Sequence, residues 1–475
     1  MQLRMADTST IRPTLAGLPQ PFGGQLLLPG DGGYDEGRRI HNGMIDRRPA
    51  LIACCHSTSD IVAAVAFARH AGLELSIRGG GHNVGGRAVT NGGVMVDLSQ
   101  MRNVEVDPES REARAEGGAT WGDVDRATQQ HGLAVTGGMI SSTGIGGLTL
   151  GGGLGWLMGK YGLTVDSLVS AEVVTADGNV LTASEREHPD LFWALRGGGG
   201  NFGVVAAFRY HLHEVGPDVV GFRIAHPFEA AEEMLRFYRD YTATIPDELT
   251  VNAGLLHAPD GSGDRLSGLV GCHVGTAEQA ERDLEPLLGF GSPLDVLHGP
   301  MAYTTVNSLL DDAYPRGALN YWKSSFLDGF ADDAIAAMVE QFATCPSQTS
   351  SFVVENLHGE ATRVPTTATA VPFRERGYNF LITSVWGDPG ATDRNVAWTR
   401  EAFEGMKPFF ASRCYVNYLD EEAGDASIRD AYGPNYERLV EVKTAYDPGN
   451  LFRLNQNIPP KPRARVSRSP GSARA

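Results

Sequence analysis

Three glycine-rich segments within the first 203 residues constrain the fold of this chain more than any other feature. The first, RGGGHN at residues 78–83, follows a short apolar run at 73–77 that predicts a buried strand. Glycine has no side chain, so backbone N–H groups in such a loop can turn toward an anion and approach it closely. The pattern favours a loop that holds a pyrophosphate, with Arg78 adding charge at its mouth and His82 at its tip. An ordinary glycine-rich turn with an exposed histidine is the alternative.

The other two segments, at 136–160 and 197–203, fail the two best-known nucleotide motifs. Residues 198–203 fit G-x-G-x-x-G, but they follow a predicted helix and open a strand, whereas a Rossmann fingerprint does the reverse. Gly159-Lys160 resembles the end of a P-loop, yet Leu154 and Tyr161 stand where that motif needs Gly and Ser or Thr. Either three tight turns occur in a β-rich domain, or one large, flat, anionic cofactor such as a flavin dinucleotide lies along the backbone.

Composition narrows the class of protein. A chain of 475 residues holds two or three domains' worth of core, and its net charge of −17 argues against nucleic-acid or anionic-membrane partners. Five scattered cysteines form no C-x-x-C pair, which predicts reduced, buried thiols and neither a disulfide framework nor a metal site. We find no signal peptide and no apolar run of about 18 residues, so the expected location is the cytoplasm.

Before about residue 215, the turn signal Asp177-Gly178 lies between two strand-like runs and predicts a β-hairpin. After about residue 215 the pattern changes. Helix-length segments alternate with strand-like runs, which predicts an α+β fold with a sheet covered by helices. The basic, Pro- and Ser-rich tail at 461–475 is predicted to be disordered.

Five segments, in order and with matching spacing, resemble the berberine bridge enzyme-like flavoproteins of the vanillyl-alcohol oxidase superfamily. They are RGGGHN at 78–83, TGIGGLTLGGGLGWL at 143–157, KYGLTVDSL at 160–168, PDLFWALRGGGGNFGVV at 189–205 and YDPGNLFRLNQNIPP at 446–460. The resemblance implies a two-part PCMH-type FAD-binding domain at 20–217. It also implies a substrate domain at 218–410 with an antiparallel sheet covered by helices, and a C-terminal segment at 411–460 that returns to the FAD domain.

The resemblance also implies the cofactor and its attachment. His82 matches the histidine that bonds through a ring nitrogen to the flavin 8α-methyl group, a nucleophilic role that requires neutral imidazole. Many relatives add a second link through a cysteine, but Ile140 stands at that position, so we expect one covalent link. The remaining implied FAD contacts are Arg78, Gly79, Gly80, Gly81, Asn83, Thr143, Gly144, Gly147, Gly203, Val205, Asn455 and Asn457.

Tyr418 matches the tyrosine that several relatives use as a catalytic base. Because a free tyrosine has a pKa of about 10, neighbouring groups would have to lower it. Residues expected on the pocket-lining strands are Tyr321, Lys323 and Glu355, with Trp156 from the second glycine segment. Strand alternation places Tyr321 and Lys323 on one face, which could equally be a solvated face.

The resemblance implies an oxidase that moves a hydride from a small, secondary-metabolite-like alcohol, phenol, amine or ring C–H to FAD, with O₂ then yielding H₂O₂. Residues 34–53 and the closing LFRLNQNIPP are similar to a bacterial subgroup that includes an enterocin-pathway flavoenzyme working through a flavin-N5-oxide. Thr143 matches that subgroup, while Ser142 and Gly254 depart from it. The alternatives are therefore an N5-oxide oxygenase and a flavoprotein that sequesters a small aromatic compound.

Overall fold

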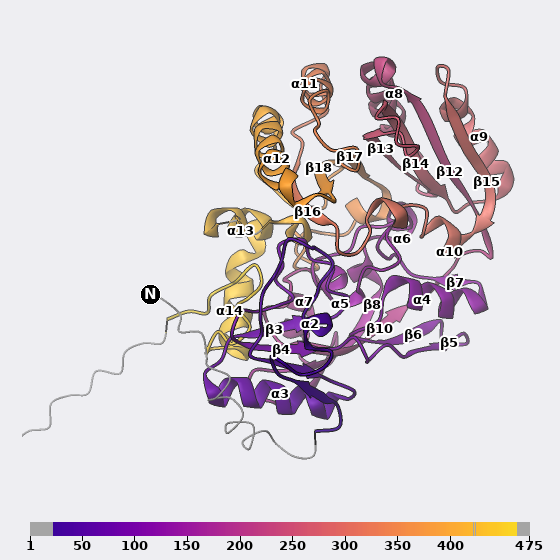
Figure 1. Cartoon of the computed structure of the whole chain (residues 1–475). Helices are drawn as coiled ribbons and strands as arrows, with labels where there is room; N and C mark the ends of the chain where they lie inside the picture. Colours follow the sequence, from indigo (N-terminus) through magenta and orange to yellow (C-terminus); the bar gives the residue numbers. More distant parts are fainter. Residues whose placement is uncertain (1–21, 421, 423, 463–475) are drawn as a thin grey trace, which may run out of the picture.

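The computed structural model describes residues 22–420, 422 and 424–462. The tail predicted to be disordered lies outside the described residues from 463 onward. The chain has an α+β fold, as predicted, built on a four-stranded, a five-stranded and a seven-stranded sheet with one small two-stranded ribbon. In Figure 1 the four-stranded and five-stranded sheets occupy one half of the molecule, the glycine-rich half, and the seven-stranded sheet occupies the other.

The four-stranded sheet has the order β1-β2-β4-β3, in which β2, β4 and β3 run parallel. Its helix α3 (Thr58–Ala71) begins after Ser57, whose side chain accepts a hydrogen bond from the Asp60 N–H, and ends at Gly72 in a left-handed conformation. Helix α3 packs against β4 and also against the five-stranded sheet, so it joins the two sheets. The strands are β1 (Gln25–Leu27), β2 (Leu51–Cys54), β3 (Leu75–Arg78) and β4 (Val94–Asp97).

The five-stranded sheet is antiparallel, with the order β5-β6-β10-β8-β9. The predicted hairpin at Asp177-Gly178 joins β8 to β9, and the third glycine segment does follow a helix, α7 (Pro189–Leu195), and precede a strand, β10. Helix α4 (Trp121–Thr128) packs its tryptophan into the core of this sheet. The strands are β5 (Val104–Asp107), β6 (Glu112–Glu116), β8 (Leu168–Val174), β9 (Val180–Ser184) and β10 (Val204–His211); β7 (Leu133–Ala134) and β11 (His213–Glu214) pair separately.

The seven-stranded sheet is antiparallel, with the order β15-β12-β14-β13-β17-β18-β16. Four helices cover one face, and the other face turns toward the glycine-rich half (Figure 1). The strands are β12 (Asp218–Pro227), β13 (Leu249–His257), β14 (Arg265–His273), β15 (Asp295–Ala302), β16 (Leu319–Phe326), β17 (Ser351–Leu357) and β18 (Gly377–Trp386). The covering helices are α8 (Ala231–Thr242), α9 (Ala277–Leu288), α11 (Asp332–Phe342) and α12 (Thr392–Met406).

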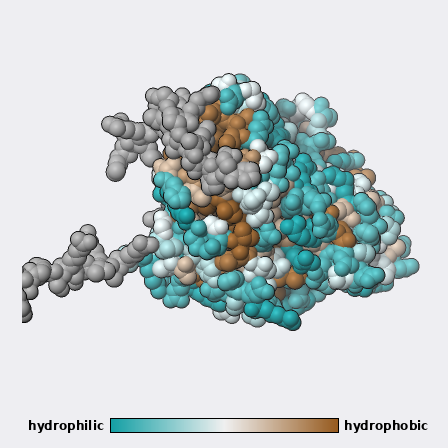
Figure 2. All heavy atoms as spheres, turned by 90° about the horizontal axis from the view of Figure 1, so that it is seen from below, coloured by the Kyte–Doolittle hydropathy of each residue, from teal (hydrophilic) through white to brown (hydrophobic). Residues whose placement is uncertain are grey.

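The C-terminal helices return to the glycine-rich half, where α14 (Tyr436–Tyr446) packs against α7 and follows α13 (Asp425–Tyr432). The buried Lys443 ammonium of α14 donates hydrogen bonds to the Asn201 and Phe452 carbonyls and pairs with the Asp447 carboxylate, 2.7 Å away. Seen from below, this half is mainly hydrophilic with small separate hydrophobic patches (Figure 2). None of the described helices combines the length and apolar character needed to cross a bilayer.

Candidate functional site

The first two glycine loops touch through their backbones. A Cβ atom built on Gly80 would lie under 3.0 Å from the Gly144 nitrogen, and one built on Gly144 would lie equally close to the Gly80 nitrogen. Real side chains do not come this close to backbone, so both positions require glycine. Gly147 differs, because a Cβ there would meet nothing within 4 Å. The loops therefore form one main-chain platform with open space beside Gly147.

Gly79 and Gly80 also line a cavity of about 610 Å³, together with Thr120, Ser141 and Ser142. The main chain of the first loop is thus accessible from a hollow, as a group that binds backbone N–H requires. Thr143 starts the second loop, where its carbonyl accepts the Trp121 N–H at 2.9 Å.

Arg78 does not place a free charge at the mouth of the loop. Its guanidinium is buried, pairs with both oxygens of Asp97 and donates to the carbonyls of Gly37 (2.6 Å) and Arg39 (3.0 Å). The positive charge is neutralised, and the side chain fixes the start of the loop to the neighbouring strand β4. Asn83 stabilises the other end, where its side-chain oxygen accepts the Arg87 N–H at 3.3 Å.

His82 stacks on a second histidine that the sequence did not point to. The ring centroids of His82 and His41 lie 3.8 Å apart with an interplanar angle of 22°. His82 is half-buried as a residue, and its ring Nε2 is buried without a hydrogen-bond partner, as is Nε2 of His41. Burial lowers the pKa of His82 to about 3 and that of His41 to about 4. Both rings are neutral at pH 7, which is the state a nucleophilic imidazole needs.

The third glycine loop is held by the C-terminal segment. The Asn455 amide donates to the Gly200 carbonyl at 2.7 Å, and Asn201 bonds the main chain of Gln456 and Ile458. Asn455 therefore fastens this loop, while the Asn457 side-chain oxygen is buried with no partner.

Gly203 and Val205 serve packing between strands. A Cβ at Gly203 would lie 2.6 Å from the Val173 side chain and 2.7 Å from the Val174 carbonyl, so glycine here permits β10 to approach β8. Val205 is buried in the core of the five-stranded sheet. Trp156 is likewise a core residue, buried in a cluster with Leu157 and Tyr303.

On the substrate side, the partly buried Tyr418 forms a hydrogen-bonded pair with the buried Glu355. The Tyr418 hydroxyl donates to one carboxylate oxygen of Glu355 at 3.0 Å, and the Asn379 amide donates to the other at 2.7 Å. Burial raises the pKa of Glu355. Burial, and then the Glu355 carboxylate, raise the pKa of Tyr418 well above its usual value. Every described group that shifts the tyrosine pKa raises it, whereas the sequence argument required a lowered pKa. Tyr418 therefore keeps its proton, and the Glu355 carboxylate is the member of the pair that can accept one.

The segment that carries Tyr418 is bonded directly to the second glycine segment. The Asn417 amide donates to the Leu148 carbonyl at 3.1 Å, and the Gly153 N–H donates to the Tyr415 hydroxyl at 3.0 Å. These bonds bring the Tyr418–Glu355 pair to the side of the sheet that faces the glycine loops.

Tyr321 and Lys323 share a face, as strand alternation predicts, but it is not the face of Glu355. In the register of β16, β18 and β17, Trp322 and Ser324 lie on the Glu355 face. Tyr321 and Lys323 lie on the helix-covered face, where the Lys323 ammonium is 5.3 Å from the ring centroid of Phe403 in α12. The expectation that Tyr321, Lys323 and Glu355 line one pocket is therefore corrected.

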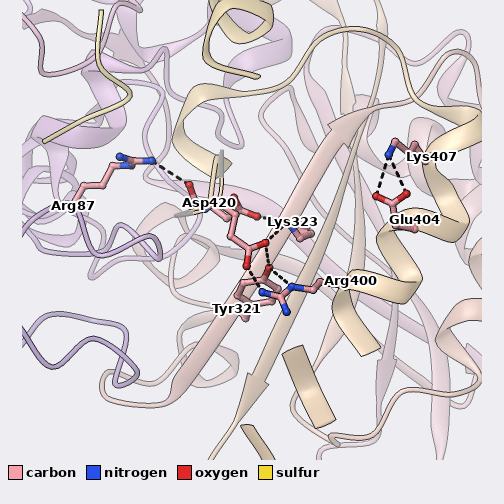
Figure 3. A network of polar contacts seen from close by, with 8 residues as sticks. Arg87, Tyr321, Lys323, Arg400, Glu404, Lys407 and Asp420 are labelled. Atoms are coloured by element: carbon pink, nitrogen blue, oxygen red, sulfur yellow. Dashed lines mark hydrogen bonds and ion pairs between the residues drawn. The ribbon is translucent and has the colours of Figure 1, made fainter. Parts of the chain in front are cut away.

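Figure 3 shows what Tyr321 and Lys323 do instead. Lys323 pairs with Asp420, the Tyr321 hydroxyl donates to Glu422 at 2.7 Å, and Arg400 of α12 pairs with Glu422. Arg87, from the glycine-rich half, donates to the Asp420 carbonyl at 3.2 Å. This polar network anchors the segment after Tyr418 to β16, α12 and the first half of the chain.

Comparisons with known proteins identify the family. The family model described as "FAD binding domain" matches residues 49–184, and the model "Berberine and berberine like" matches residues 414–459. An uncharacterised FAD-linked oxidoreductase of Bacillus subtilis is 32% identical over 92% of this chain and 97% of its own length. The (R)-6-hydroxynicotine oxidase of Paenarthrobacter nicotinovorans is 31% identical over 93% of this chain and 98% of its own. The chain belongs to the berberine bridge enzyme-like FAD-linked oxidoreductases.

Solved structures agree with this assignment. The crystal structure of 6-hydroxy-D-nicotine oxidase from Arthrobacter nicotinovorans superposes with a TM-score of 0.85 at 28% identity, covering 93% of this chain and 98% of that one. The protein is thus an FAD-binding oxidoreductase with the PCMH-type fold.

The described residues of this berberine bridge enzyme-like protein fit a flavin. A covalently held flavin dinucleotide would use three of their features. These are the platform of Gly80 and Gly144, the open space at Gly147, and the neutral His82 with its unpartnered ring nitrogen. Sequence reasoning missed His41, Trp322 and Asn379. Only Trp322 had a signal, because it sits between the two residues singled out on its strand.

Proposed function

We propose that this enzyme holds its FAD covalently through His82 and oxidises a small organic molecule by hydride transfer to the flavin, with O₂ as the final acceptor and H₂O₂ as product. The observation that carries the proposal is the Tyr418–Glu355 pair bonded, through Asn417 and Tyr415, to the second glycine segment. Relatives named for oxidation of 6-hydroxynicotine and of xylooligosaccharides support a small organic substrate.

The residues of the chain divide the work as follows. FAD, when bound, supplies the two-electron acceptor. The glycine loops would present N–H groups to its pyrophosphate, and neutral His82 would supply the nitrogen for the covalent bond. Ile140 replaces the cysteine of doubly linked relatives, which supports a single bond.

Tyr418 and Glu355 would handle the substrate proton. A substrate O–H or N–H would donate to the Tyr418 oxygen while the Tyr418 proton moves to the Glu355 carboxylate, 3.0 Å away. Burial raises the pKa of Glu355, which makes its carboxylate a stronger base than an exposed glutamate and suits it to this role.

Acid denaturation followed by intact mass measurement tests the attachment. We expect the denatured protein to carry the mass of one FAD and to fluoresce, and we expect His82→Ala to lose both properties. Flavin that leaves with the supernatant would reject the covalent bond and keep FAD as a cofactor. A Cys introduced at Ile140 provides a comparison, because it restores the residue type used for a second link.

Peroxide measurement tests the reaction type. When an oxidase turns over its substrate, it releases one H₂O₂ for each O₂ consumed. A deficit of peroxide, with oxygen found in the product, would identify an N5-oxide oxygenase instead. Tight binding of aromatic compounds with no reduction of the flavin would identify a sequestering protein.

A further inference from the structure

The face of the seven-stranded sheet that carries Glu355 holds buried polar atoms without a hydrogen-bond partner, two amide oxygens and the Ser324 hydroxyl among them. Asn252, Glu355 and Asn379 lie directly opposite one another on β13, β17 and β18, and all three are at most 5% exposed. The side-chain oxygens of Asn252 and Asn379 are buried with no hydrogen-bond partner. The orientation of Asn379 is fixed by its amide, which donates to Glu355, so its oxygen necessarily points elsewhere.

Glu355 has no cation. Both donors to its carboxylate, Tyr418 and Asn379, are neutral, and among the described residues no lysine, arginine or histidine pairs with it. Two donors and no acceptor are the partners of an ionised carboxylate rather than a protonated one. A buried charge without a counter-charge is costly, so it persists where function requires it. Lys323 of β16 cannot supply the missing charge, because it lies on the opposite face of the sheet and pairs with Asp420.

Aromatic rings border the same face. The ring centroids of Trp322 and Tyr418 lie 6.4 Å apart at 70°, and those of Tyr314 and Trp322 lie 5.5 Å apart at 68°. Tyr314 also reaches the face through its hydroxyl, 3.5 Å from the Thr383 hydroxyl. The faces of such rings attract cations, and their area suits an aromatic ligand.

From this combination we propose that the substrate is an arylalkylamine that binds as its ammonium ion, with the nitrogen against Glu355 and the unpartnered asparagine oxygens, and the ring among Trp322, Tyr314 and Tyr418. This inference rests on the proposed function, because it takes the Glu355 face as the substrate pocket. The ammonium proton would then follow the same relay: the substrate N–H bond breaks as its proton passes to the Tyr418 oxygen, and the Tyr418 proton passes to Glu355. The neutral amine keeps its lone pair for oxidation.

A neutral alcohol fits this pocket less well. It brings one O–H donor to at least three acceptor oxygens and leaves the Glu355 charge without a partner. An ammonium ion brings up to three donors and the missing charge.

The test compares two ligands of the same shape on the holoenzyme: benzyltrimethylammonium and its neutral carbon isostere, neopentylbenzene. Binding is measured by isothermal titration calorimetry and by the change in flavin absorbance. We expect the cation to bind about tenfold more tightly or better at about pH 8, and Glu355→Gln to reduce that preference to within about twofold. Glu404→Gln is the matched control, because Glu404 is an exposed carboxylate of the same half, paired with Lys407 and remote from the Glu355 face (Figure 3).

Equal or tighter binding of neopentylbenzene by the wild-type enzyme would overturn the proposal, as would a Glu355→Gln variant that keeps the preference. If that variant does not fold, the wild-type enzyme gives the same information, because its preference for the cation should fall as pH is lowered and Glu355 takes up a proton. If the enzyme prefers the cation but no amine reduces its flavin, the oxidase function alone is contradicted. Anaerobic reduction by benzylic alcohols about tenfold faster than by benzylic amines would contradict the amine proposal alone.

Discussion

The two halves of this enzyme are built for binding in different ways. The glycine-rich half presents main chain: Gly80 and Gly144 meet backbone to backbone, and the side chains around them, such as Arg78, are committed to holding the loops in place. The seven-stranded half presents side chains: Glu355, Asn379 and Trp322 reach one face of a sheet whose other face is packed with helices. Where backbone forms the site, almost no glycine can be replaced. Where side chains form the site, binding depends on which of two successive strand residues points toward the pocket.

The largest effect is expected where the two glycine loops touch. Gly144→Ala puts a Cβ under 3.0 Å from the Gly80 nitrogen, and neither backbone can move without opening the platform. We expect the flavin content per protein, measured by absorbance after gel filtration, to fall about tenfold or more. Gly387→Ala is the control, because a Cβ there meets nothing within 4 Å. Full flavin content in Gly144→Ala would show that side chains, not backbone, hold the cofactor.

Glu355→Gln should leave the flavin in place and remove the reaction. Glutamine keeps the shape of the side chain but cannot accept the proton that Tyr418 would pass on, so we expect kcat to fall by a factor of about 10² to 10⁴. Stopped-flow reduction of the flavin under anaerobic conditions measures the loss, and Glu404→Gln should retain the wild-type rate. A rate within about threefold of wild type would exclude Glu355 as the proton acceptor.

Two neighbouring residues of β16 test which face of the seven-stranded sheet binds the substrate. Trp322→Leu removes a ring from the Glu355 face, and we expect KM to rise about tenfold, equivalent to about 1.4 kcal/mol. Tyr321→Phe removes a hydroxyl bonded to Glu422 on the opposite face, and we expect KM to change by less than about twofold. The reverse ranking would place the substrate on the helix-covered side and would contradict the assignment of the pocket.

The same contrast explains what could be predicted from the sequence. Local signals located the hairpin at Asp177-Gly178, the strand after the third glycine segment and the mixed α+β fold, because turn chemistry and glycine spacing act over a few residues. The alternation of Tyr321 and Lys323 was also correct, but which face they occupy depends on pairing with β18, more than 50 positions away. The partners of Glu355 come from β18 and from the C-terminal segment, so no local pattern could reveal them.

His41 departs from the main-chain pattern of the glycine-rich half, because it contacts His82 through its side chain. Its pKa is lowered to about 4, first by burial and then by Arg316, whereas an unfolded histidine titrates at about 6.5. Between these values the unfolded chain binds more protons than the folded one, so lowering the pH from about 7.5 to about 5.5 should reduce the free energy of unfolding by about 1.4 kcal/mol through His41 alone.

His41→Phe keeps a ring against His82 and removes this titration. We expect urea unfolding at the two pH values to show a smaller loss of stability in His41→Phe than in the wild type, by about 1 kcal/mol. His70→Gln, at an exposed position of α3, should keep the wild-type pH dependence. An unchanged pH dependence in His41→Phe would mean that the stacked pair already carries a proton in the folded enzyme. The neutral His82 on which the proposed flavin attachment depends would then lose its support.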